Sequence, residues 1–154
     1  MNEQELREYF NEVRESFTKV SELANFQIDI DDIEVEILMA GNTHVPTRLK
    51  QGYMAAYIFK NDDICFKVGK VGARSNARYQ FQHYNPYSSR SNLARSILND
   101  NDLNLNFENQ NNVGEWIKNN ITRINLLLHE KHKIFLLNLL EAFLQCRLKP
   151  RYEG

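Results

Sequence analysis

The chain has few cysteines and no long hydrophobic run, and both absences narrow what it can be. Its two cysteines, Cys65 and Cys146, are too few for a disulfide framework, so we predict reduced thiols in a cytoplasmic protein. No apolar stretch approaches the roughly 18 residues that a transmembrane helix requires, and we expect no membrane partner. The first five residues are acidic and lack the basic-then-apolar order of a signal peptide.

The net charge of −1 hides a strong asymmetry along the chain. Residues 1–46 carry eleven acidic and three basic side chains, a net charge of −8. Residues 47–98 carry nine basic side chains against two acidic ones, a net charge of +7. A basic body behind an acidic N-terminal segment predicts a polyanionic partner for the body, the alternative being a chance segregation of surface charge.

The acidic segment has the periodicity of one helix and one strand. Apolar residues recur every three or four positions over residues 4–25, which predicts an amphipathic helix docked on the core. Residues 28–37 then alternate isoleucine and valine with carboxylates, with one slip at Asp31-Asp32, which favours an edge strand. We therefore predict an N-terminal extension over residues 1–46, followed by a domain over residues 47–154.

The basic body begins with a hairpin. Residues 53–59 and 64–68 are β-prone and flank the turn Asn61-Asp62-Asp63. Symmetric pairing about Asp62 would place Tyr57 opposite Lys67 on one face, an inference that depends on the register. Helices are expected from Ser75 or Asn76 to about Tyr84, over 93–98, 113–118 and 133–146, with a third strand over 123–128. The predicted fold is of the α/β class (α+β type), with a small, mainly antiparallel three-stranded sheet flanked by helices.

Two residues stand out within this pattern. Lys67 lies between Phe66 and Val68, where a buried charge would need a partner. Glu141 is a lone carboxylate in an apolar helical run, although the helix could simply turn it to solvent. Taken singly, Tyr57 is an ordinary cross-strand packing residue and Arg78 an ordinary surface arginine.

Taken in order, these residues resemble the motifs of the GIY-YIG nuclease family over roughly residues 52–152. Ala55-Ala56-Tyr57 matches the first motif through its tyrosine, and Lys67-Val68-Gly69 matches the second. Lysine replaces the second tyrosine, as in some restriction endonucleases of the family. The family's arginine matches Arg78, its metal-binding glutamate matches Glu141, and its histidine matches His83.

The resemblance implies a metal-dependent endonuclease that hydrolyses phosphodiester bonds in nucleic acid, with double-stranded DNA as the expected partner. One Mg²⁺ (or Mn²⁺) held by Glu141 would polarise a phosphate oxygen, and Arg78 would clamp the phosphate. A neighbouring Lys67 cation would lower the pKa of Tyr57 and let it act as a base, or Lys67 itself would hold the attacking water. His83 would contact the phosphate or assist proton transfer.

Three basic side chains complete the predicted nucleic-acid interface: Lys70, Arg74 and Arg90. The changed motif residues also leave an alternative, a nucleic-acid-binding module that keeps this fold without cutting. A third interpretation, a protein-interaction domain built on the acidic helix, explains the first 40 residues but not the basic body.

Overall fold

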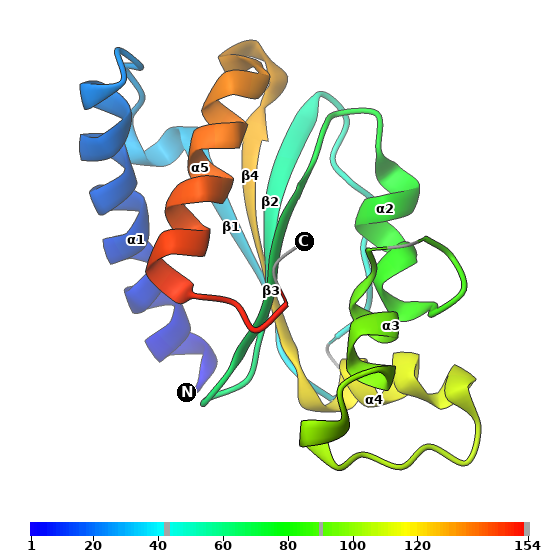
Figure 1. The fold of residues 1–154 in the computed structure, drawn as a ribbon. Coiled ribbons are helices and arrows are strands. Elements are labelled where there is room, and N and C mark those ends of the chain that lie inside the picture. Colours follow the sequence, from blue (N-terminus) through cyan, green and yellow to red (C-terminus); the bar gives the residue numbers. More distant parts are fainter. Residues whose placement is uncertain (42–43, 90, 153–154) are drawn as a thin grey trace.

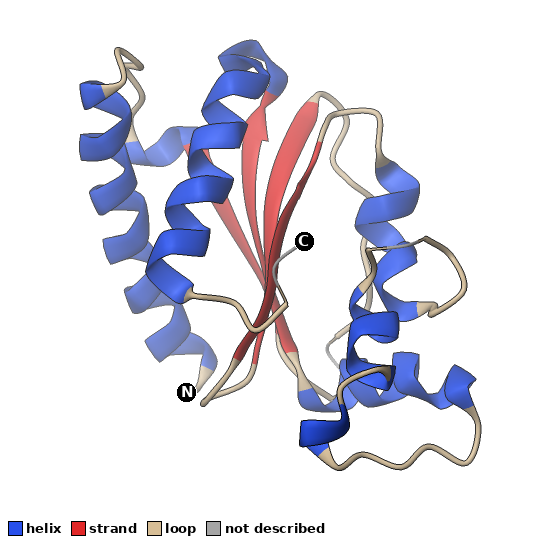
Figure 2. Ribbon diagram, viewed as in Figure 1, coloured by secondary structure: helices blue, strands red, loops and turns tan. Residues whose placement is uncertain are grey.

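The computed structural model describes residues 1–41, 44–89 and 91–152 and has the predicted α+β class. One antiparallel sheet with the strand order β1-β4-β2-β3 runs through the centre of the molecule (Figure 2). Its strands are β1 (Ile33–Leu38), β2 (Tyr53–Lys60), β3 (Cys65–Val71) and β4 (Thr122–His129). β3 is an outer strand, and one of its edges pairs with no other strand of the described residues.

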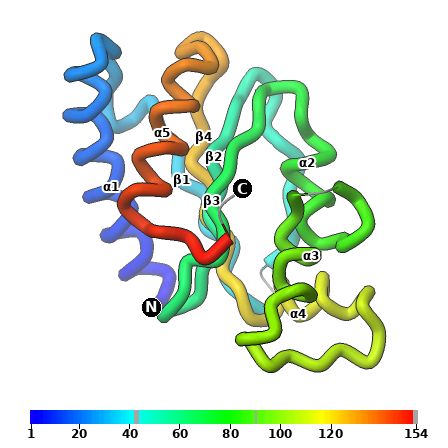
Figure 3. Tube along the Cα trace, in the orientation of Figure 1, coloured from blue at the N-terminus to red at the C-terminus, as the bar shows by residue number. Residues whose placement is uncertain are grey.

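Helices cover both faces of the sheet (Figures 1 and 3). One face, which we call the α1–α5 side, packs against α1 (Glu3–Leu23) and α5 (Lys133–Leu148). The other, the α2–α4 side, lies under α2 (Asn76–Gln80), α3 (Leu93–Leu98) and α4 (Val113–Asn120). Short 3₁₀ turns join these elements: η1 (Ile30–Asp32), η2 (Gln82–Tyr84), η3 (Asn101–Leu103), η4 (Gln110–Asn112) and η5 (Glu130–His132).

The N-terminal helix forms as its periodicity predicts. Asn2 and Glu5 make a reciprocal capping box that satisfies two backbone N–H groups at the start of α1. The apolar stripe then faces the sheet and is fully or almost fully buried, with Leu6, Phe10, Val13 and Phe17 as its members. These side chains belong to the same apolar cluster as α5, so α1 completes the α1–α5 core.

The strand predicted over residues 28–37 is wrong in its first half. Residues 30–32 form the turn η1, and β1 begins only at Ile33. Asp29 and Asp32 hold this turn, because the Asp29 N–H donates to the Asp32 carboxylate at 2.9 Å and the Asp32 N–H donates to the Asp29 carbonyl at 3.0 Å. Short acidic side chains that satisfy the local backbone compete with a strand in this way.

The strand of the N-terminal extension joins the central sheet and makes it four-stranded. β1 pairs with β4 in register from Ile33 opposite Leu128 to Leu38 opposite Arg123. Both cysteines are free thiols, as predicted. Among residues 1–41, 44–89 and 91–152, no helix combines the length and apolar character needed to cross a membrane.

Candidate functional site

The hairpin β2–β3 positions Tyr57 and Lys67. Its register differs from the predicted one. Tyr57 pairs with Gly69, and Lys67 pairs with Phe59. The Asn61 side chain accepts hydrogen bonds from the N–H groups of Asp63 and Ile64, which tightens the turn to two residues. A bulge beside Phe59 adds a second one-residue shift. Two such shifts restore the original face, so Tyr57 and Lys67 still share the α2–α4 side, as diagonal instead of direct neighbours.

Gly69 lets the Tyr57 ring cross the outer strand. A Cβ atom at Gly69 would lie 2.4 Å from the Tyr57 hydroxyl oxygen and 2.6 Å from the ring carbon that carries it. Any side chain at position 69 would therefore occupy the space of the ring. Position 69 is therefore restricted to glycine, because the Tyr57 ring lies directly against it.

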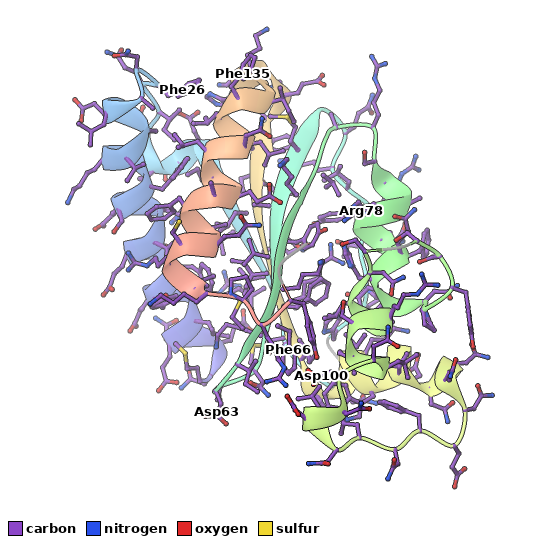
Figure 4. The ribbon with its side chains drawn as sticks, in the orientation of Figure 1. Phe26, Asp63, Phe66, Arg78, Asp100 and Phe135 are labelled. Carbon is purple, nitrogen blue, oxygen red and sulfur yellow. The ribbon has the colours of Figure 1, made fainter. Side chains whose placement is uncertain are left out.

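The Tyr57 hydroxyl ends beside a cleft of about 290 Å³ at the edge of β3. The cleft is lined by Tyr57, Lys67, Val68, Gly69, Lys70, Arg78, Ser91, Glu141 and Gln145. These residues come from both sides of the sheet: α2 contributes Arg78 from one side (labelled in Figure 4), and α5 contributes Glu141 from the other. The structure thus brings together the tyrosine, lysine, arginine and glutamate that the sequence singled out.

The C-terminal segment limits how much of the β3 edge remains open. The N–H groups of Arg151 and Tyr152 donate to the carbonyls of Cys65 and Phe66 at 2.8 and 2.9 Å. Asp100 anchors this segment by accepting hydrogen bonds from the Arg151 guanidinium and the Tyr152 hydroxyl, near Phe66 (Figure 4). The cleft therefore opens beside the second half of β3, past the point where the C-terminal segment stops pairing.

Lys67 and Arg78 lie on the α2–α4 side of the cleft. The Lys67 side chain is almost fully buried, and its ammonium group donates to the Ser91 hydroxyl at 3.4 Å. The half-buried Arg78 guanidinium donates to the Ser91 carbonyl at 3.5 Å. Ser91 therefore contacts both cations and fixes where they approach the cleft.

Glu141 and Lys70 form an ion pair on the α1–α5 side of the cleft. Alternation along β3 turns Lys70 away from Lys67 and toward α5. The sequence predicted Lys70 as a nucleic-acid contact and Glu141 as a metal ligand, and here they neutralise each other. The lining residues carry three positive charges and one negative charge, which suits an anionic ligand.

The predicted lowering of the Tyr57 pKa is wrong. Burial raises the pKa of this hydroxyl above its ordinary value, and the charges of Arg78 and Arg123 only partly oppose that effect. The fully buried hydroxyl has no hydrogen-bond partner among the described residues. The prediction did not take into account that burial removes the phenol from water, which disfavours its charged form and raises its pKa. The Lys67 cation, which was expected to lower this pKa, is only a diagonal neighbour of Tyr57.

His83 is not brought to the cleft. Its ring lies fully buried against the Tyr57 ring, with 4.6 Å between the two centroids. The Leu93 N–H donates to His83 Nδ1 at 3.3 Å, and burial holds the histidine pKa well below its usual range. His83 is not among the residues that line the cleft, and its ring instead supports the position of Tyr57.

Two predicted nucleic-acid contacts remain. Arg74 is exposed and lines a separate groove beside the start of α2. Arg90 lies outside the described residues. Of the two predicted contacts that the structure describes, Lys70 lines the cleft and Arg74 does not.

Sequence reasoning missed Arg123, a fully buried arginine in β4. Its Nε donates to the Asn125 side-chain oxygen at 2.8 Å, and one terminal nitrogen donates to the Tyr84 hydroxyl at 3.2 Å. The guanidinium carbon also lies 4.4 Å from the centroid of the Tyr79 ring. This cation sits beneath Tyr57 and Phe59, so it supports the floor of the site.

Glu36 supplies the compensating negative charge through two intermediaries. Its carboxylate accepts hydrogen bonds from the Asn125 amide at 2.6 Å and from the Tyr79 hydroxyl at 2.9 Å. The signal in the sequence was the alternation of Arg123 and Asn125 with apolar residues. It could have been recognised only with the knowledge that β4 is a central strand, paired on both sides.

Comparison of the chain with protein-family models, with curated proteins and with solved structures finds no match.

Proposed function

We propose that this protein is a metal-dependent endonuclease whose active site is the cleft at the edge of β3. The observation that carries the proposal is the convergence of Tyr57, Lys67, Arg78 and Glu141 on this one cleft, from four separate elements of the fold. The resemblance to the GIY-YIG nuclease family was based on the order of these residues along the chain. The same chemistry also requires these four side chains to lie close together in space, which their order along the chain does not ensure.

The positive side chains suit a phosphodiester. Arg78 offers a planar fork of N–H donors for two phosphate oxygens, and Lys67 adds a compact charge beside it. Both are partly or almost fully withdrawn from water, so their attraction for an anion is screened less than at an open surface. A phosphate bound here would lie against the Tyr57 hydroxyl.

The donor set fits one hydrated magnesium ion. Among the described residues there is no cluster of three or more histidine, cysteine or acidic side chains that would hold a zinc ion. Magnesium needs less from the protein, because it keeps several waters and binds through one or two carboxylates together with substrate phosphate. Glu141 would supply that carboxylate once Lys70 releases it. The bound ion would polarise a phosphate oxygen and stabilise the leaving oxygen.

The raised pKa of Tyr57 assigns it a donor role. A phenol that stays protonated at neutral pH donates a hydrogen bond to a phosphate oxygen that gains negative charge in the transition state. Such a preorganised donor in a buried position is worth more than the same group in water. Lys67 would hold the attacking water, whose hydroxide form the cluster of cations favours.

One observation favours the alternative of a binding module that does not cut. Lys70 pairs with Glu141, the sole acidic side chain among the described residues that line the cleft. If this ion pair persisted beside bound nucleic acid, no metal could reach the carboxylate. In the endonuclease, bound phosphate would draw Lys70 away from Glu141 and leave the carboxylate free for the metal. In the non-cleaving module, the Lys70–Glu141 ion pair would persist.

Cleavage of supercoiled plasmid DNA tests the proposal and separates the two functions. We expect nicked and linear products in the presence of Mg²⁺ or Mn²⁺ and none in EDTA, while fluorescence anisotropy detects DNA binding in both conditions. Binding without metal-dependent cleavage would support the non-cleaving module. The absence of both cleavage and binding would refute any role in nucleic-acid chemistry.

A further inference from the structure

A second basic depression lies close to the cleft and shares no residue with it. This groove has a volume of about 460 Å³ and is lined by Arg48, Leu49, Gln51, Gly52, Ala73, Arg74 and Asn76. It lies where the loop before β2 meets the segment that connects β3 to α2. The groove therefore continues in the direction in which β3 leaves the cleft.

The two arginines of the groove have no partner within the described part of the chain. Both side chains are exposed, and neither Arg48 nor Arg74 makes a hydrogen bond or ion pair there. The neighbouring Glu34 is already neutralised by Lys50 at 2.8 Å. The Glu130 carboxylate also lies near the floor, about 4.0 Å from where a Cβ of Gly52 would lie. Two unpaired guanidinium groups against one carboxylate leave the groove positive.

The walls of the groove are held in place from both sides. The Leu49 N–H donates to the Asn76 side chain at 2.9 Å, which ties the loop to the start of α2. The Glu130 N–H donates to the Gly52 carbonyl at 2.8 Å, which ties the same loop to the end of β4. A shaped and anchored pocket loses little conformational freedom when an anion enters it.

The groove lies within a few residues of the cleft along the chain. Lys70 lines the cleft and Ala73 lines the groove, so the chain between these two residues spans at most about 10 Å. One strand of duplex DNA carries a phosphate about every 3.4 Å along the helix axis. The two sites are therefore no more than about three nucleotides apart along one strand.

We propose that the Arg48–Arg74 groove binds a second backbone phosphate of the same strand, within about three nucleotides of the bond that is cut. This inference is based on the proposed function, and it narrows the substrate class to a polynucleotide that extends past the cleft on the α2 side. A dinucleotide would occupy the cleft alone. The groove thus adds affinity and sets the direction in which the strand lies.

A salt series tests whether the groove contacts phosphate. The affinity of a short DNA duplex is measured by fluorescence anisotropy in EDTA with the full chain and with the double variant Arg48→Ala/Arg74→Ala. Each lost contact should lower the slope of log affinity against log salt by about 0.9. The matched control is Arg7→Ala/Lys19→Ala, which removes the same charge from α1 on the opposite side of the sheet and should leave the slope nearly unchanged.

A phosphate scan tests the position. Single phosphates of the duplex are replaced by neutral methylphosphonates, one position at a time. Neutralising one particular phosphate within about three nucleotides of the cut bond should weaken binding to the full chain by roughly two- to fivefold, the range for an exposed charge pair. The same replacement should have no effect on Arg48→Ala/Arg74→Ala, because its partner is already gone.

The outcomes separate this inference from the proposed function. Equal slope changes in both double variants, or an unchanged slope in the groove variant, would overturn the groove as a phosphate site and leave the endonuclease proposal intact. If neutralising any phosphate of the duplex weakened binding by the same factor, the groove would not contact one particular phosphate within about three nucleotides of the cut bond. A full chain that binds no DNA would overturn both proposals together.

Discussion

The two sides of the sheet bury different kinds of side chain. On the α1–α5 side the buried cluster is apolar and includes Phe10, Phe17 and Leu140. On the α2–α4 side the buried set includes the charged groups Lys67 and Arg123. Burying a cation costs free energy unless it is paired, so a fold under selection for stability alone would avoid these positions. We infer that the first side provides most of the stability and contributes Lys70 and Glu141 to the cleft, whereas the second side holds the cations Lys67 and Arg78.

The largest expected effect breaks the stabilising side alone. Phe10→Ala removes a fully buried ring from the α1–α5 core and should lower the free energy of unfolding by about 3–5 kcal/mol. Urea denaturation followed by circular dichroism measures this loss. DNA cleavage per folded molecule should stay near the wild-type rate, because α1 contributes no residue to the cleft. A selective loss of activity in folded protein would contradict the division between the two sides.

Tyr57→Phe should have the opposite signature. We expect a loss of about 10²-fold in the cleavage rate, the lower range for removal of a group that handles charge or protons in the transition state. The free energy of unfolding should stay equal or rise by up to about 1 kcal/mol, because the deleted hydroxyl is buried without a partner among the described residues. Single-turnover kinetics and urea denaturation measure the two quantities. Wild-type cleavage by this variant would remove the hydroxyl from the mechanism.

Gly69→Ala tests the contact that joins the two motifs. The new methyl group would overlap the Tyr57 ring, and we expect a loss of about 1–3 kcal/mol in the free energy of unfolding together with reduced cleavage. Gly72→Ala is the matched control, because nothing lies within 4 Å of a Cβ at that position. Thermal unfolding of both variants measures the difference. Equal stability of the two variants would show that Tyr57 does not lie over Gly69.

Lys70→Met has the smallest expected effect and tests the ion pair across the cleft. Removing the ammonium group frees Glu141, so Mn²⁺ should bind up to about fivefold more tightly in the absence of DNA. Isothermal titration calorimetry measures this affinity, and Lys19→Met on α1 controls for the change in net charge. An unchanged or weaker affinity would mean that Lys70 does not compete with the metal.

Local rules predicted much of the fold. The spacing of Leu6, Phe10, Val13 and Phe17 indicated α1, and two β-prone segments on either side of the turn at residues 61–63 indicated the hairpin. The prediction failed where a side chain outweighed the pattern. Asp29 and Asp32 replaced the start of a strand by a turn, and Asn61 with a bulge shifted the hairpin register by two residues.

The sequence singled out side chains that meet in one cleft, but it did not indicate their electrostatics. Tyr57, Lys67, Arg78 and Glu141 could be picked out because their order along the chain resembles that of the GIY-YIG motifs. The raised pKa of Tyr57 depends on burial, which comes from helices distant in sequence. The role of Arg123 likewise depends on β4 being central in the sheet, and a single sequence does not contain that information.

In the proposed mechanism, Glu141 holds the metal ion for cleavage at the edge of β3. Glu141→Gln keeps the side-chain volume and removes the charge, and Glu12→Gln makes the same change on exposed α1 as a control. The decisive measurement is the rate of plasmid cleavage in Mg²⁺ by these two variants, with DNA binding followed in parallel. The account predicts that Glu141→Gln binds DNA but does not cut it, while Glu12→Gln cuts at the wild-type rate. Metal-dependent cleavage by folded Glu141→Gln at the wild-type rate would contradict it.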